Sequence, residues 1–187
     1  MRTRSQRPAE PPQSARLRLR PFTDGDAAYV LDQTTQPSWL ETIGDRGIRT
    51  EADAIAFIRD RLNPHHAEHG FGFWVVERRA DGVAVGMCGL IVRPELDGPD
   101  LGYALLPDYW GQGYAREAAR ATANWARDVL GLRRLLAIVT PGNAPSVRVL
   151  EAIGMHYVET VTFPGGDGED DDTVELYRVE WPAADPA

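Results

Sequence analysis

The stretch "YWGQGYAREAAR", residues 109–120, places two glycines at alternate positions directly before a segment with helical periodicity. Gly111 and Gly113 lead into apolar residues at helical spacing, namely Tyr114, Ala118, Ala121, Trp125 and Val129. This spacing predicts an amphipathic helix that ends at Gly131. The preceding run "DLGYALL", residues 100–106, predicts a strand that stops at Pro107. The stretch therefore predicts a strand, a tight turn with a bare backbone, and a helix.

Three explanations compete for the glycines of this turn. A nucleoside-triphosphate loop needs a lysine after its last glycine, and the chain contains no lysine. A dinucleotide-binding turn needs a third glycine, where this chain has Arg116. An anion-binding turn remains, because a helix that begins at Tyr114 exposes free backbone N–H groups and the positive end of its dipole. A tight turn with no ligand is the alternative.

Short apolar runs and helical segments divide the rest of the chain. Before the turn we expect a strand at 17–20, helices at 23–33 and 50–62, and strands at 71–79 and 83–92 joined by a hairpin turn at 80–82. After it we expect a strand at 133–140, a helix at 143–154 capped by Asn143, and strands at 155–163 and 173–181. This order predicts an α/β domain with a mixed sheet.

Length and composition indicate one domain. The chain has 187 residues, of which 43% are hydrophobic, enough for a single core. We expect a loose tail at 1–15, the domain at 16–182 and a short tail at 183–187. The net charge of −8 argues against nucleic-acid binding, which depends on clustered cations. Since neither a long apolar run nor a signal-peptide pattern is present, we expect no membrane association and a cytoplasmic location.

Two motifs together resemble a known family. "LPDYWGQGYA" at 106–115 and "NAPSVRVLEAIGM" at 143–155 look like the central motifs of the GNAT superfamily of N-acetyltransferases, in particular its ribosomal-protein N-terminal acetyltransferase branch. Trp110 stands where the glycine motif usually begins with glutamine or arginine. The resemblance covers roughly residues 17–181. It implies a mixed, mostly antiparallel sheet of about six or seven strands, splayed in the middle, with about four helices.

The resemblance implies acetyl-coenzyme A as the cosubstrate, bound in the V between strands 100–106 and 134–140. The backbone of Ala104, Leu105 and Leu106 would pair with the pantetheine arm like an added strand. The implied pyrophosphate site consists of Trp110, Gly111, Gln112, Gly113, Tyr114, Ala115 and Arg116. From the next helix, Asn143 would contact the pantetheine, and Ser146 and Val147 would lie beside the thioester sulfur.

The implied reaction is direct attack of a primary amine on the thioester in a ternary complex. The leaving thiolate needs a proton. Many family members use a tyrosine whose position here is Leu150, so the resemblance makes Ser146 the candidate acid; the alternative is that Ser146 only bonds backbone in the first helical turn. Asp100, where the family often has an acidic residue, is the candidate base, and a solvated aspartate at a strand end is the alternative.

The acceptor is the least defined part of this expectation. A protein amino terminus or a small-molecule amine would fit. Trp39, in the connection between the first two helices, is a candidate acceptor-binding residue. Tyr103, which we expect to share the face of Asp100, is another, with a plain core role as the alternative. Because dimers are common in this branch, a homodimer is a further expectation. A non-catalytic acyl-coenzyme A sensor on the same fold is the alternative function.

Three other features carry weaker expectations. Cys88, the only cysteine, lies in a β-rich apolar run and should be a buried, inert thiol. "HHAEH" at 65–69 should be short and irregular, and we expect no metal site. The acidic run at 165–172 is typical of a solvated hairpin loop, and attraction of a cationic acceptor is the alternative.

Overall fold

A single mixed sheet forms the centre of the protein. The computed structural model describes residues 10–163 and 172–182, and its sheet has seven strands in the order β1-β2-β3-β4-β5-β7-β6. All neighbouring strands are antiparallel except β4 and β5. The α/β fold predicted from the sequence is confirmed. The strands are β1 (Leu17–Arg20), β2 (Phe73–Arg78), β3 (Ala84–Ile91), β4 (Asp100–Leu105), β5 (Arg134–Val139), β6 (His156–Phe163) and β7 (Asp172–Glu180).

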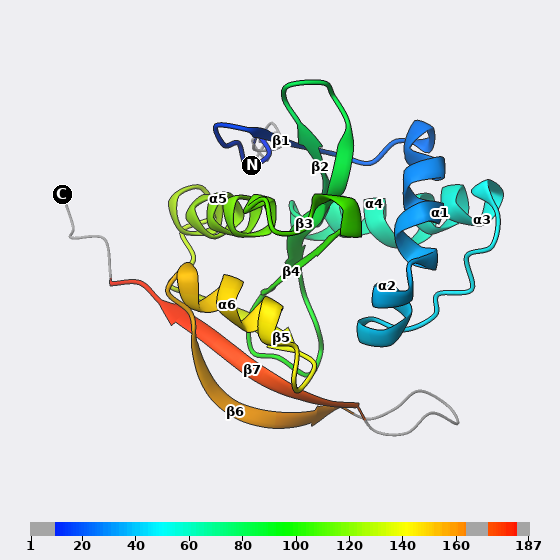
Figure 1. Ribbon diagram of the computed structural model, residues 1–187. Coiled ribbons are helices and arrows are strands. Elements are labelled where there is room, and N and C mark those ends of the chain that lie inside the picture. The colour runs from blue at the N-terminus through cyan, green and yellow to red at the C-terminus, as the bar shows by residue number, and fades with distance from the viewer. Residues whose placement is uncertain (1–9, 164–171, 183–187) are drawn as a thin grey trace, which may run out of the picture.

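Helices cover both faces of the sheet (Figure 1). On one face lie α5 (Tyr114–Asp128) and α6 (Ala144–Ala152), packed over a core that includes Cys88. On the other lie α1 (Ala27–Thr35), α2 (Pro37–Thr42) and α3 (Glu51–Phe57), over a second core that includes Met87. The helix α4 (Asn63–His69) has no buried residue, and its His66 ring packs edge-on against Trp74 of the first core. Burial on both faces explains the continuous apolar run of β3. Among the described residues, no helix combines the length and apolar character needed to cross a bilayer.

Two short helices were not predicted. The helix α2 begins at Pro37, whose fixed φ suits a first helical turn. The helix α4 contains the "HHAEH" stretch, so the expectation of an irregular segment is wrong; Pro64 falls in the first turn, where its missing N–H is harmless, and Gly70 ends the helix at φ 78°. The ring of His65 accepts a hydrogen bond from the Val92 N–H at 3.0 Å, so it fastens α4 to the chain after β3.

The segment before β1 is bound to the domain. The Glu10 carbonyl accepts a 2.7 Å hydrogen bond from the Trp125 indole, and Gln13 forms an antiparallel bridge with Arg18. The Ser14 hydroxyl donates to Glu117 of α5 at 2.8 Å. The expectation of a loose tail is therefore wrong for residues 10–15, because polar groups of α5 and β1 hold them; residues 1–9 and 183–187 lie outside the described part of the chain.

The sheet opens between β4 and β5. These two parallel strands share one register pair, Asp100 with Leu136, whereas β3 and β4 pair along their whole length. Beyond Asp100 the two strands diverge, and the backbone on this side of β4 has no neighbouring strand (Figure 1). The splayed sheet implied by the resemblance is confirmed, and it creates a gap that reaches both faces.

Candidate active site

The turn that leads into α5 needs glycine for its backbone angles. Gly111 has φ 72° and Gly113, the N-cap residue of α5, has φ 79°, both in the left-handed region that glycine adopts at no steric cost. A side chain at Gly111 would meet no atom, and one at Gly113 would meet only the Arg16 guanidinium at 3.5 Å. The space in front of the turn is therefore open. The first N–H groups of α5 face a site where an anion can approach.

The free edge of β4 offers fewer backbone groups than expected. The Leu106 N–H donates to the Val85 carbonyl of the β3 side at 3.0 Å, so ladder alternation turns the backbone of Ala104 toward β3 as well. Their expected backbone pairing with a pantetheine arm is therefore wrong. Alternation directs the backbone of Tyr103 and Leu105 into the gap. The Leu105 carbonyl already accepts the Trp110 indole N–H at 2.8 Å, which leaves the Leu105 N–H.

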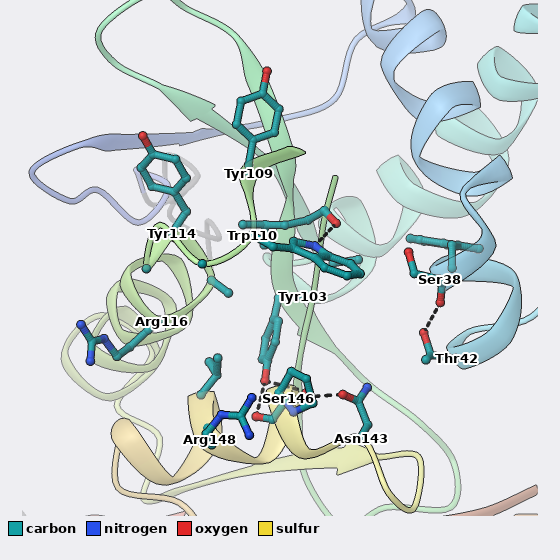
Figure 2. Close-up of a pocket in the computed structure, with 18 of the residues that line it drawn as sticks. Ser38, Thr42, Tyr103, Tyr109, Trp110, Tyr114, Arg116, Asn143, Ser146 and Arg148 are labelled. Carbon is teal, nitrogen blue, oxygen red and sulfur yellow. Dashed lines mark hydrogen bonds between the residues drawn. The ribbon is translucent and has the colours of Figure 1, made fainter. Parts of the chain in front are cut away.

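A cavity of about 550 Å³ extends from the glycine turn to the start of α6 (Figure 2). Its walls include most residues of the expected cosubstrate site. Gln112 does not line it: its carbonyl accepts from Arg16 at 3.1 Å, and its amide donates to the Asp108 carbonyl at 3.1 Å. Val147 packs against the core instead. The expected residues that line the cavity are Ala104, Leu105, Trp110, Gly111, Gly113, Tyr114, Ala115, Arg116, Asn143 and Ser146.

A second cavity, of about 670 Å³, extends toward α2 and the π-helical turn Ile58–Leu62. Its lining includes Asp100, Arg93 and the beginning of β7. Trp39, Tyr103 and Ser146 line both cavities. The two cavities therefore meet where the sheet is splayed, which allows two ligands to approach one point from different directions.

Ser146 and Tyr103 are bound to each other at this meeting point (Figure 2). The Tyr103 hydroxyl lies 2.8 Å from Ser146 Oγ and donates to the Ser146 carbonyl at 3.0 Å. The Ser146 N–H donates to Asn143 Oδ1 at 3.2 Å, which caps α6 as predicted. Ser146 Oγ therefore forms a hydrogen bond with the Tyr103 side chain at the cavity, in contrast to the alternative that it bonds only backbone in the first helical turn. Burial raises the pKa of Tyr103 well above its usual value, with the Ser146 bond acting in the opposite direction, so the phenol is protonated at neutral pH.

Asp100 is buried, in contrast to the solvated strand-end alternative. It is 1% exposed, and both carboxylate oxygens lie 3.2 Å from Nε of Arg93. Burial raises its pKa, and the Arg93 charge opposes that rise. Tyr103 does not share the face of Asp100 as expected, because residues three positions apart on a strand point to opposite faces. Arg93 was missed, since nothing in its local sequence marks a partner for Asp100.

Trp39 lies on α2 and is 5% exposed. Its indole N–H has no hydrogen-bond partner among the described residues.

Leu150, at the position where many family members carry a tyrosine, is fully buried in the core. Of the acidic run at 165–172, only Asp172 is described, and it lines the second cavity. In the described ranges no cluster of three or more His, Cys, Asp or Glu side chains is arranged to hold a metal ion.

The sequence matches a family model over residues 16–156, and that model describes an acetyltransferase (GNAT) domain. The chain belongs to the GNAT acetyltransferase family. GNAT membership agrees with the splayed sheet of this fold. It also gives the activity, which is acetyl-coenzyme A dependent N-acetylation.

Curated GNAT relatives support this assignment. The chain is 32% identical over 143 residues to the uncharacterized N-acetyltransferase YnaD of Bacillus subtilis, covering 75% of this chain and 79% of YnaD. It is 29% identical over 181 residues to the FsC-acetyl coenzyme A-N(2)-transacetylase of Aspergillus fumigatus, covering 90% and 76%. A third relative, YkkB of Bacillus subtilis, is 36% identical over 96 residues, and the match spans 50% of this chain and about half (55%) of YkkB.

Solved GNAT structures share the fold. A GNAT acetyltransferase from Bacillus anthracis superposes with a TM-score of 0.74 at 25% identity, covering 90% of this chain and 97% of that one. The ribosomal-protein α-N-acetyltransferase RimL superposes with a TM-score of 0.75 at 14% identity, covering 90% and 96%. At that identity the RimL likeness concerns the fold alone.

The residues of the first cavity fit acetyl-coenzyme A. The open backbone at Gly111 and Gly113 and the amides that start α5 suit a diphosphate. Arg116 and Arg148 line the same cavity and form no ion pair within residues 10–163 and 172–182. The Leu105 N–H at the free edge of β4 can bind an amide carbonyl of the pantetheine arm.

Proposed function

We propose that the protein transfers the acetyl group directly to a primary amine that enters through the second cavity while acetyl-coenzyme A occupies the first. The observation that carries this proposal is the meeting of the two cavities at Tyr103 and Ser146. Two ligands held there can react without dissociating, and such positioning supplies a large part of a rate enhancement. A protein amino terminus or a small-molecule amine is the proposed acceptor class, and the cytoplasmic location and a homodimer stay predictions.

Direct transfer is favoured over a covalent enzyme intermediate. Cys88 is the only cysteine of the chain. It is fully buried, its sulfur lies 3.4 Å from the Thr122 hydroxyl, and it lines neither cavity. Burial raises the pKa of its thiol to about 12, so little reactive thiolate forms at neutral pH. Cys88→Ala should therefore keep full thiol-releasing activity.

Ser146 is the proposed proton donor. The thioester supplies the acetyl group: the amine nitrogen bonds to its carbonyl carbon, the carbon–sulfur bond breaks, and the thiolate needs a proton. The Ser146 hydroxyl lies at the meeting point of the cavities. The protonated Tyr103 phenol forms a hydrogen bond with Ser146 Oγ, and it can return a proton to this oxygen after the serine has given up its own. Tyr103 thus acts through Ser146, which makes it a positioning residue.

Asp100 is the proposed base. It lines the cavity assigned to the acceptor, and its raised pKa makes it a stronger base than an exposed aspartate. Arg93 holds the carboxylate charged and oriented. The acceptor amine would lose its proton to Asp100 directly or through water.

The test combines cosubstrate binding and turnover. We expect coenzyme A to bind with measurable heat in isothermal titration calorimetry, and acetyl-coenzyme A to release thiol with at least one member of an amine panel that includes peptide amino termini. The buried Leu150 leaves the usual tyrosine position without an acid, which is the observation that favours a non-catalytic acyl-coenzyme A sensor. Binding without turnover for every amine would support the sensor. Absence of binding would exclude both functions.

A further inference from the structure

We propose that the amine acceptor carries an oxyanion group, a carboxylate or a phosphate, and that Arg46 and Arg61 bind this group in the second cavity. Both arginines line that cavity, together with Asp100. The inference rests on the proposed function, because it names the class of acceptor for the same reaction.

The first argument is the distribution of unpaired arginines. Arg49, Arg59 and Arg93 each meet a carboxylate, as do most arginines of the described chain. Arg46 and Arg61 form no ion pair within residues 10–163 and 172–182. In a chain of net charge −8, carboxylates are abundant, so two uncompensated guanidinium groups at one cavity need an explanation. Arg116 and Arg148 also form no ion pair in these ranges, and they line the cavity that fits a diphosphate. The other arginines without an ion pair there, Arg79, Arg120 and Arg133, line neither of the two cavities.

The second argument is that two of the three described acidic side chains that line this cavity already form ion pairs. Asp45 pairs with Arg49, and Asp100 pairs with Arg93. Asp172 is the remaining acidic residue of the lining, and no ion pair of it occurs among the described residues. Among the described lining residues, this single negative charge is outnumbered by the guanidinium groups of Arg46 and Arg61. The balance therefore favours an acceptor with a negative group in addition to its amine.

The third argument is the backbone that supports the two side chains. Arg61 belongs to the π-helical turn Ile58–Leu62, an irregularity that is frequent at functional sites. Ile58 and Leu62 are buried and anchor this turn, and Arg61 between them is exposed. Arg46 donates to the Ile43 carbonyl at 3.1 Å, and Ile43 also lines the cavity. Guanidinium groups bind carboxylate and phosphate in a fork geometry that a partner lacking oxyanions cannot match.

The experiment compares matched acceptors. Thiol release from acetyl-coenzyme A is measured with leucine against leucinamide, a dipeptide against its amide, and glucosamine 6-phosphate against glucosamine, with spermidine as an acceptor without an oxyanion. In at least one pair we expect kcat/KM to be at least ten-fold higher for the acceptor that carries the oxyanion than for its neutral counterpart. A preference in the leucine or dipeptide pair would indicate a carboxylate, and a preference in the glucosamine pair would indicate a phosphate. Equal or faster turnover of the amides, of glucosamine and of spermidine would overturn the inference and leave the acetyltransferase function intact.

Variants test the two arginines directly. Arg46→Met and Arg61→Met should each lower kcat/KM for the preferred acceptor about ten-fold and leave turnover of its neutral partner and the affinity for coenzyme A unchanged. Arg133→Met, at an exposed arginine outside both cavities, is the matched control. Binding of the oxyanion-bearing amines to the coenzyme A complex is measured by calorimetry, independently of turnover. The inference would be refuted if none of the oxyanion-bearing amines bound the unmodified protein. It would also be refuted if they bound equally well to the double variant that carries both Arg46→Met and Arg61→Met. Both results can be obtained even if no acceptor turns over.

Discussion

The Tyr103 hydroxyl lies 2.8 Å from Ser146 Oγ and joins two elements that stand on opposite sides of the splay in the sheet. Tyr103 comes from β4 and Ser146 from the first turn of α6. The phenol has one proton: when it donates to Ser146 Oγ, the serine hydroxyl can donate in turn toward the leaving thiolate. In the proposed mechanism a tyrosine from β4 would thereby support the acid on α6, while Leu150 of α6 is buried in the core.

Loss of either hydroxyl should slow catalysis without weakening cosubstrate binding. We expect Ser146→Ala to lower kcat about 100-fold, in the range of a lost general acid, and Tyr103→Phe to lower it about ten-fold. Affinity for coenzyme A, measured by calorimetry, should stay within about two-fold because neither change touches the diphosphate site. Tyr157→Phe is the matched control, since it removes a similar 3.0 Å bond to the Thr160 hydroxyl on β6. A Tyr103→Phe enzyme with normal kcat would show that Ser146 needs no positioning partner.

Substitution in the glycine turn should act on binding in addition to stability. Gly113→Ala and Gly82→Ala both place a side chain at positive φ, 79° and 74°, with no severe clash. Each should cost about 1 kcal/mol of unfolding free energy. Only Gly113→Ala should lower the affinity for coenzyme A, by about ten-fold or more, because this substitution disturbs the backbone amides that face the diphosphate. Denaturant unfolding and calorimetry on both variants separate the effects. Equal affinities would mean that the turn does not hold the diphosphate.

The sequence was sufficient for the fold because strong local signals marked each large element. The glycines at 111 and 113, the stripe of α5 and the Asn143 cap were all visible as patterns. It was insufficient for α2 and α4, which have no clear periodicity and depend on tertiary contacts: Trp39 of α2 is buried in the second core, and His66 of α4 packs against Trp74 of the first. The Asp100–Arg93 pair and the Tyr103–Ser146 bond were also hidden, since they depend on how loops and strand faces meet in space. The direction of the Ala104 and Leu106 backbone required the ladder register.

The pH dependence of turnover should report Asp100. If Asp100 is the base, kcat/KM falls as pH drops through its pKa, which burial raises above the ordinary value of about 3.9. Arg93→Met removes the opposing charge, so the pKa should rise further and the acidic limb should move to higher pH. Asp100→Asn should abolish that limb and lower kcat/KM about 100-fold. Arg134→Met, which breaks the exposed pair with Asp97, is the control. An unchanged acidic limb in Arg93→Met would exclude Asp100 as the group that titrates.

The Arg20–Asp26 pair should make stability depend on pH. Arg20 donates to both Asp26 oxygens, at 2.9 Å and 2.7 Å, and joins β1 to the start of α1. Burial alone would raise the pKa of Asp26, but Arg20 and the Thr23 N–H and hydroxyl outweigh it and hold the pKa below its usual value. A lowered folded pKa stabilises the protein above the unfolded value of about 3.9 and loses that contribution as pH falls through the folded value.

Asp26→Asn should therefore cost about 2 kcal/mol of unfolding free energy at pH 7, because the partly buried Arg20 guanidinium loses one of its two carboxylate partners and keeps only Glu77. The difference from the unmodified protein should shrink as the pH is lowered from about 4, where Asp26 of the unfolded chain becomes protonated, through the lower pKa of Asp26 in the folded protein. Urea denaturation at several pH values measures both quantities. Asp24→Asn, which removes the exposed partner of Arg59, should have a smaller effect at every pH. A constant difference across the acid range would show that Asp26 acts by hydrogen bonding and packing alone, with no contribution from its charge.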